Sequence, residues 1–213
     1  MKYCIFMPTT FIIDKNSHLF KSNQLEKTEK RLKQYQQGIN KIVELNKNYN
    51  FDIYIADNGY DFDDKIKIPP CIKLIKNNPN KFGRYNKGSG IIEIWNNNIE
   101  ILKQYDYFIH FEPRQLLIDN YFIDNFMKNI RTLFTYNSNP NAMRHFNTGL
   151  FACKSKELLQ FINQCSPEFL VNRNAGIEYI LYNFFHNNNI KYDILDKMNL
   201  IWFDSNTKKE YYW

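Results

Sequence analysis

The chain has 213 residues and a mass of 25.8 kDa, which is room for one domain with a core of its own. Hydrophobic residues make up 44% and aromatic residues 17%, with only 7 Gly and 7 Pro, and this composition excludes a disordered or collagen-like chain. Lys and Arg total 28 against 22 Asp and Glu, so the formal charge of +6 favours anionic partners.

No run of residues approaches the roughly 18 consecutive apolar positions that span a bilayer, so we expect no membrane span. The apolar stretch 3–7 is interrupted at Pro8, and no small-residue cleavage site follows, which indicates a buried strand and not a signal peptide. We therefore expect a cytoplasmic protein. The four cysteines have no CxxC spacing and indicate neither a zinc site nor a disulfide framework.

Short apolar runs bounded by turn residues predict strands, and apolar residues at helical spacing between them predict helices. The expected strands are 3–7, 51–56, 72–75, 107–111, 132–136, 147–154 (turn plus strand), 190–195 and 200–203. The expected helices are 24–46, 91–102, 122–130 behind an Asp119 cap, one that begins at 155, and 176–187. This alternation predicts a single α/β domain over residues 1–213: a three-layer sandwich with a central mixed, mostly parallel sheet flanked by helices.

Three polar clusters follow predicted strands of this sheet. They are Pro8-Thr9-Thr10, Asp57-Asn58-Gly59 and Glu112-Pro113-Arg114. Each could be an ordinary loop or turn, but in an open α/β sheet ligands bind outside the carboxyl ends of the strands. Their joint placement predicts a binding site at that edge.

The order of these clusters resembles the glycosyltransferases of the GT-A fold, in which a later strand runs into an acidic DxD motif. The resemblance covers about residues 3–185. It implies that Asp57 contacts the base or ribose of a nucleotide, and that Pro8, Thr9 and Thr10 border the same pocket. It further implies that Arg84 and Lys87, in the polar loop 77–90, approach the donor, where fixed cations can bind a diphosphate.

In that family the DxD carboxylates hold a divalent cation on the phosphates of the donor. Here the motif falls on Glu112-Pro113-Arg114, so only its first acid is present. A second register takes His110-Phe111-Glu112, because residues two apart on a strand face the same side. Glu112 belongs to both, and oxygen ligands with an imidazole suit Mn²⁺ or Mg²⁺. His110 in an apolar strand is equally well explained as a core residue.

Two further segments resemble the family. The segment 145–151, His-Phe-Asn-Thr-Gly-Leu-Phe, resembles one that lines the sugar and acceptor pocket, which implies that Asn147, Thr148 and Gly149 border the sugar. Glu178 resembles an acid near the reacting carbon, which is the general base in inverting members. Glu178 and Asn147 are therefore the expected catalytic residues, although the helix dipole also explains an acid in a first helical turn.

Within the family, the sequence looks most like the glycosyltransferases that large chlorella viruses encode. That resemblance implies a hexose transferred from a UDP-sugar to a hydroxyl of a glycan or glycoprotein acceptor. It further implies Mn²⁺ dependence, retention of anomeric configuration, and a place in the host cytoplasm in the synthesis of a viral capsid glycan.

Two other functions are compatible with the composition. A nucleotide-sugar pyrophosphorylase should have a Gly-rich phosphate loop after the first strand, and the segment 8–11 contains no Gly. A nucleic-acid-binding module should expose aromatic residues beside Lys and Arg. Most aromatic residues lie instead in apolar periodic segments, for example Phe122, Phe126, Phe184 and Phe185, so we expect no nucleic-acid partner.

Overall fold

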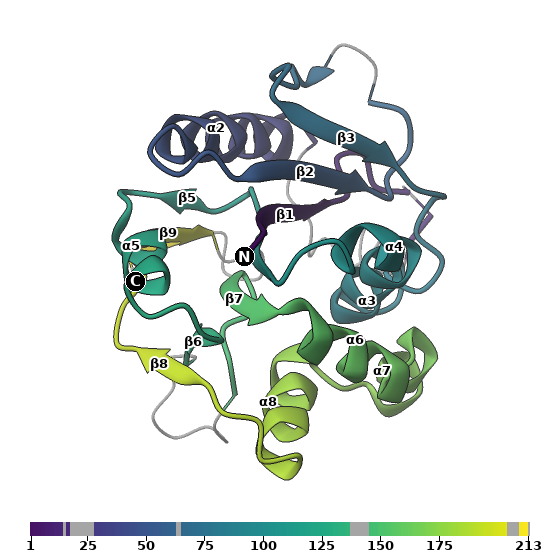
Figure 1. Cartoon of the computed structure of the whole chain (residues 1–213). Coiled ribbons are helices and arrows are strands. Elements are labelled where there is room, and N and C mark those ends of the chain that lie inside the picture. The colour runs from purple at the N-terminus through teal and green to yellow at the C-terminus, as the bar shows by residue number, and fades with distance from the viewer. Residues whose placement is uncertain (15, 18–27, 63–64, 137–144, 204–208, 213) are drawn as a thin grey trace.

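A seven-stranded sheet forms the centre of the molecule in the computed structural model, which describes residues 1–14, 16–17, 28–62, 65–136, 145–203 and 209–212 (Figure 1). The strand order is β3-β2-β1-β4-β7-β6-β8. The strands are β1 (Tyr3–Thr9), β2 (Asp52–Asp57), β3 (Ile72–Lys76), β4 (Tyr107–Phe111), β6 (Leu133–Thr135), β7 (Leu150–Lys154) and β8 (Asp193–Leu195). Among the strands described, β7 alone runs opposite to the others, which confirms the predicted mixed, mostly parallel sheet.

Helices cover both faces of this sheet, which gives the three predicted layers (Figure 1). On one face lie α2 (Thr28–Asn46) and α5 (Tyr121–Lys128). On the other lie α3 (Lys87–Asn97), α4 (Ile99–Leu102), α6 (Ser155–Gln164), α7 (Pro167–Arg173) and α8 (Ile177–Asn187). Because successive strand residues point to opposite faces, β1 supplies Ile5 and Met7 to the first core and Phe6 to the second.

A second, three-stranded antiparallel sheet was not predicted. It consists of β5 (Leu116–Leu117), β9 (Leu200–Phe203) and β10 (Glu210–Tyr212), in the order β10-β9-β5. Only β9 was expected as a strand. β5 has two residues and β10 is exposed along its length, so neither has the apolar pattern that identifies a strand from sequence.

The helices also differ from the prediction in detail. Helix α3 begins at Lys87, earlier than expected, because the Asn86 side chain caps it by accepting a hydrogen bond from the Ser89 N–H. Helix α5 has Asn120 at its cap position, and Asp119 accepts instead from the Tyr121 N–H. Helix α7, which follows Ser166 and Pro167, was missed. Residues 24–27 of the first predicted helix lie outside the described part of the chain.

Gly38 allows α2 to touch the chain that follows β4. A Cβ atom at this position would lie 2.1 Å from the Pro113 carbonyl oxygen and 2.7 Å from that of Gln115. Both are backbone atoms, so any side chain here would separate α2 from the segment that carries Glu112 and Arg114. A glycine in a helix interior is costly, and this close approach is its structural reason.

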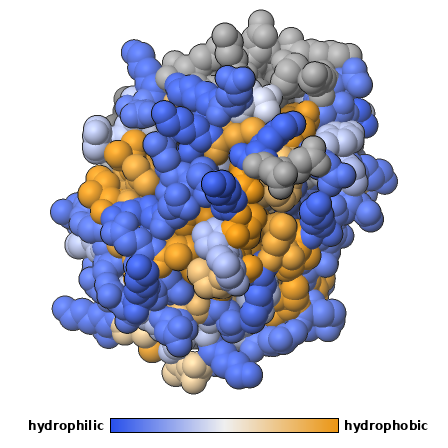
Figure 2. Space-filling view, turned by 90° about the horizontal axis from the view of Figure 1, so that it is seen from above, coloured by the Kyte–Doolittle hydropathy of each residue, from blue (hydrophilic) through white to orange (hydrophobic). Residues whose placement is uncertain are grey.

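The molecular surface is mainly hydrophilic. Figure 2 shows one face, on which hydrophilic residues predominate and hydrophobic residues are visible between them. Phe122, Phe126, Phe184 and Phe185 are buried, as the core interpretation of the aromatic residues predicts. None of the helices described combines the length and the apolar composition needed to cross a membrane.

Candidate functional site

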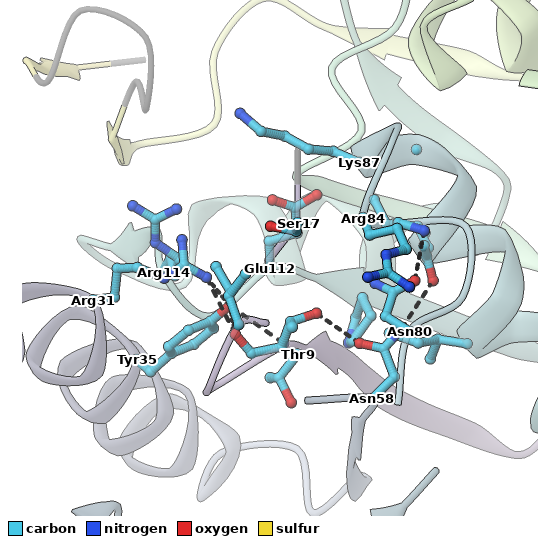
Figure 3. Close-up of a pocket in the computed structure, with 18 of the residues that line it drawn as sticks. Thr9, Ser17, Arg31, Tyr35, Asn58, Asn80, Arg84, Lys87, Glu112 and Arg114 are labelled. Carbon is cyan, nitrogen blue, oxygen red and sulfur yellow. Dashed lines mark hydrogen bonds between the residues drawn. The ribbon is translucent and has the colours of Figure 1, made fainter. Parts of the chain in front are cut away.

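A cavity of about 390 Å³ opens where β1, β2 and β4 end (Figure 3). This is the edge of the sheet at which the sequence places its polar clusters, and the volume is within the usual range for small-molecule sites. The polar residues that line it include Thr9, Thr10, Asp14, Arg31, Asn58, Asn80, Arg84, Lys87, Glu112, Arg114, Gln115 and Glu178, with Pro8, Tyr35, Tyr60 and Trp202 beside them. We refer to this cavity as the pocket.

Asp57 lies behind the pocket and does not line it. Its Oδ1 accepts hydrogen bonds from the Thr9 hydroxyl at 2.8 Å and the Phe11 N–H at 2.9 Å, and its Oδ2 accepts from the Gly59 N–H at 3.0 Å. Burial raises the pKa of this carboxyl, while the three hydrogen bonds act in the opposite direction. The structure therefore places Asp57 behind the pocket wall, and its neighbour Asn58 lines the pocket.

The loop after β3 forms one side of the pocket and is held by side-chain hydrogen bonds. Glu93 accepts from the N–H groups of residues 81–83, and Asn80 accepts from the Gly83 N–H. Arg84 forms an ion pair with Asp14 at 2.9 Å, which links this loop to the segment after β1. Lys87 follows at the first residue of α3. Both predicted cations thus line the pocket, with Arg84 neutralised by Asp14.

Two carboxylates face the pocket from different elements. Glu112 follows β4, and its backbone N–H donates to the Gly149 carbonyl at 2.8 Å. Glu178 lies in the first turn of α8 and accepts from the Thr148 hydroxyl at 3.5 Å. Burial, and then the charge of Glu178, raises the pKa of Glu112 to about 7, while the positive charges of Arg114, Lys87 and Arg31 act in the opposite direction.

The segment Asn147-Thr148-Gly149 does not line the pocket. The Asn147 side chain accepts from the Gly149 N–H at 2.8 Å, so its amide oxygen holds the turn before β7. A Cβ atom on Gly149 would lie 1.8 Å from Nε2 of Gln115, so this glycine leaves space for that buried side chain. Thr148 is connected to the pocket by the hydrogen bond that its hydroxyl donates to Glu178, which lines the pocket. The predicted loop residues 137–144 lie outside the described part of the chain.

No protein-family model matches the chain, and no curated protein sequence is significantly similar to it. Among solved structures, one similar to this chain is assigned as a nucleotide-diphospho-sugar transferase from Desulfovibrio desulfuricans G20. It has 10% sequence identity and a TM-score of 0.55, over 92% of this chain and 80% of that one. Another is a glycosyltransferase involved in glycosylation of the major capsid of PBCV-1, with 10% identity and a TM-score of 0.52, over 92% and 83%. The chain has the GT-A fold.

In this GT-A fold the two candidate metal ligands of the second register, His110 and Glu112, are separated. His110 is fully buried among aromatic rings, stacked on Phe151 with ring centroids 4.7 Å apart and edge-on to Trp95 at 5.4 Å. Neither ring nitrogen has a hydrogen-bond partner, and burial lowers its pKa to about 3, so the ring is neutral. Because β4 ends at Phe111, the strand alternation does not extend to Glu112. The structure places His110 in the core.

The side chains of the pocket do not fit a metal held by a cluster of protein ligands. In the part of the chain that the structure describes, no group of three or more His, Cys, Asp or Glu side chains could hold a metal ion. The first register, Glu112-Pro113-Arg114, offers a cation, Arg114, where the family has its second acid. Glu112 therefore has Glu178 as its acidic neighbour and is otherwise surrounded by positive charge.

Arg31 lines the pocket and was not predicted as a site residue. It is 5% exposed, and its Nη2 donates to the Thr10 carbonyl at 3.2 Å and to the Tyr35 hydroxyl at 3.4 Å. Figure 3 shows Arg31 and Arg114 together on one side of the pocket, with Arg84 on the other. The sequence does contain a signal that Arg31 is buried. Arg31 precedes Tyr35 by one helical turn, so it lies on the same buried face of α2 as the apolar residues. Gln115 was missed as well, and nothing in its sequence context distinguishes it.

Proposed function

We propose that the protein is a glycosyltransferase that moves a hexose from a UDP-sugar to a hydroxyl group of a glycan or glycoprotein acceptor. The observation that carries this proposal is the composition of the pocket at the ends of β1, β2 and β4. It combines two carboxylates, Glu112 and Glu178, with cations from three separate elements. The GT-A fold supports the same proposal, because solved structures similar to this chain include a glycosyltransferase involved in glycosylation of the major capsid of PBCV-1.

The two ends of the donor match different parts of the pocket. Thr10, Asn58 and Tyr60, after β1 and β2, offer hydroxyl, amide and ring groups that suit a nucleoside. Arg31, Lys87 and Arg114 offer positive charge that suits a diphosphate. Arg84 lies at the same cavity with its charge already paired to Asp14.

The reaction that we propose exchanges one bond at the anomeric carbon for another. The bond between that carbon and the β-phosphate oxygen breaks, and its electron pair leaves with the diphosphate. The acceptor oxygen forms the new bond and releases its proton, for which Glu178 is the proposed acceptor. Fixed cations beside the departing diphosphate stabilise the charge that develops there.

The acceptor and the stereochemical course are further parts of the proposal. The chlorella-virus resemblance implies retention of configuration and transfer in the host cytoplasm, and the PBCV-1 structure makes a capsid-linked glycan the first acceptor to test. Retention requires the acceptor to approach from the face that the diphosphate leaves. The coupling constant of the product's anomeric proton, measured by NMR, distinguishes retention from inversion.

Titration with UDP, GDP and CMP tests the donor site, followed by measurement of UDP release from a panel of UDP-hexoses with and without acceptor. We expect saturable binding of UDP in preference to GDP and CMP, and release of UDP from at least one UDP-hexose. Lys33→Met is a matched control, because Lys33 is exposed on the same helix as Arg31 but outside the pocket. If none of the three nucleotides binds with or without Mn²⁺, the proposed function is wrong.

A further inference from the structure

Arg31 is a buried cation that forms no ion pair with an acid among the described residues. Its hydrogen-bond partners are two neutral oxygens, the Thr10 carbonyl and the Tyr35 hydroxyl, and its buried Nε has no partner. Desolvating a guanidinium is costly unless a negative charge compensates it. Because Arg31 lines the pocket, an anionic ligand there would supply that charge and the missing hydrogen bond.

Arg114 is fixed beside the pocket by contacts with two other elements. Its Nε and Nη2 both donate to Oε1 of Gln34 in α2, at 3.2 and 3.0 Å. Its guanidinium also lies over the Phe203 ring of β9, 5.2 Å from the ring centroid. A planar guanidinium held in this way has a fixed orientation, which suits recognition of phosphate oxygens.

Arg31, Lys87 and Arg114 all act on the charge of Glu112, against the charge of its acidic neighbour Glu178. A divalent cation beside Glu112 would be repelled by each of these three cations. The second acid of the DxD pattern is replaced by Arg114 itself. The pocket therefore offers positive charge where the pattern has an acid, and the described residues provide no cluster of ligands for a metal.

We propose that Arg31 and Arg114 neutralise the donor diphosphate in place of a divalent cation, so that this protein binds its nucleotide and transfers the sugar without a metal. The inference rests on the proposed function. It replaces the Mn²⁺ or Mg²⁺ ion expected from the sequence with two arginine side chains. The two guanidinium groups are held in place before the donor arrives. They can therefore donate hydrogen bonds to the β-phosphate oxygens as the electron pair of the breaking bond moves onto them.

The experiment compares UDP affinity by calorimetry in excess EDTA and in excess MnCl₂, with protein first dialysed against EDTA. We expect the two dissociation constants to agree within about twofold. In EDTA, Arg31→Met and Arg114→Met should each weaken UDP binding by about 10- to 100-fold, the usual effect of losing a charged hydrogen bond. Lys33→Met, which removes an exposed charge from the same helix, should bind UDP as the unmodified protein does.

Glu112→Gln gives a second, independent measurement if the arginine variants do not fold. It removes the negative charge that faces the diphosphate, so UDP binding in EDTA should become tighter by about 3- to 10-fold. UDP binding that requires Mn²⁺ and is lost in Glu112→Gln would overturn the inference and leave the proposed function intact. Failure of UDP, GDP and CMP to bind under either condition would overturn both.

Discussion

The Thr9 hydroxyl donates a hydrogen bond to Oδ1 of Asp57 over 2.8 Å, and this contact joins the ends of two neighbouring parallel strands behind the pocket. Asp57 also accepts from the N–H groups of Phe11 and Gly59, so both of its oxygens are occupied. An acid at the end of β2 thus joins the two loops that line the pocket. These hydrogen bonds of Asp57 hold the pocket wall together.

Asp57→Ala should therefore act first on stability. The substitution leaves a buried hydroxyl and two buried N–H groups without an acceptor, and we expect the free energy of unfolding to fall by about 2–4 kcal/mol. Urea denaturation measures this change. Thr9→Val, which removes one of the three donors, should cost less. Unchanged stability together with weaker UDP binding would instead indicate direct contact between Asp57 and the nucleotide.

The sequence predicted the central sheet because buried strands and amphipathic helices have different periods, and 107–111 matched β4 at both ends. The site was located for a similar reason, since the ends of parallel strands meet at one edge. Residue roles depended on contacts that the local sequence does not determine. Asp57 and Asn58 are neighbours, yet the first lies behind the pocket and the second lines it. Arg31 reaches the pocket from a helix that begins far from any strand end.

His110 should make the protein sensitive to acid. Burial lowers its pKa to about 3 from an ordinary value of 6.5, so between these pH values the unfolded chain binds a proton that the folded chain does not. The contribution of the neutral His110 ring to the free energy of unfolding is fully present above pH 6.5, and it is lost progressively as the pH falls toward 3. In His110→Phe, which keeps an aromatic ring against Phe151, this contribution is absent.

The advantage of His110→Phe over the unmodified protein should therefore grow as the pH falls below 6.5, by up to about 1.4 kcal/mol per pH unit. Urea denaturation at neutral pH and at about pH 4.5 measures the difference. Parallel stability profiles for the two proteins would contradict the neutral, buried state of the ring. UDP binding by this variant should be unchanged in both EDTA and MnCl₂, because His110 lies outside the pocket.

Glu178→Gln should separate chemistry from binding. The carboxylate faces the pocket from α8 and is the proposed proton acceptor, so the amide should lower the rate of sugar transfer by about 10²- to 10⁴-fold. The UDP dissociation constant should change by no more than about twofold, since the proposed role concerns the acceptor hydroxyl. Initial rates and calorimetry on the same preparation measure both. A variant that retains full transfer activity would exclude Glu178 as the proton acceptor.

Thr148→Val tests whether the hydroxyl that donates to Glu178 helps to position it. Because the hydrogen bond is long, at 3.5 Å, we expect a loss of rate of less than about tenfold. The UDP affinity should be retained, as in Glu178→Gln, and initial rates and calorimetry measure both quantities. If Thr148→Val lowers the rate as strongly as Glu178→Gln, the hydroxyl itself takes part in the reaction.

Gly149→Ala should disturb the pocket through Gln115. The added methyl group would lie 1.8 Å from Nε2 of Gln115, a buried side chain that lines the pocket, so the amide must move. We expect this overpacking to cost about 1–3 kcal/mol of unfolding free energy and to weaken UDP binding. In the double variant Gln115→Ala/Gly149→Ala the clash is absent, so the two substitutions should be less damaging together than the sum of their separate effects. A double-mutant cycle should give a coupling energy of about 1–3 kcal/mol between the two positions. Additive effects would mean that glycine is needed at position 149 for the backbone of the turn and not to make room for the Gln115 side chain.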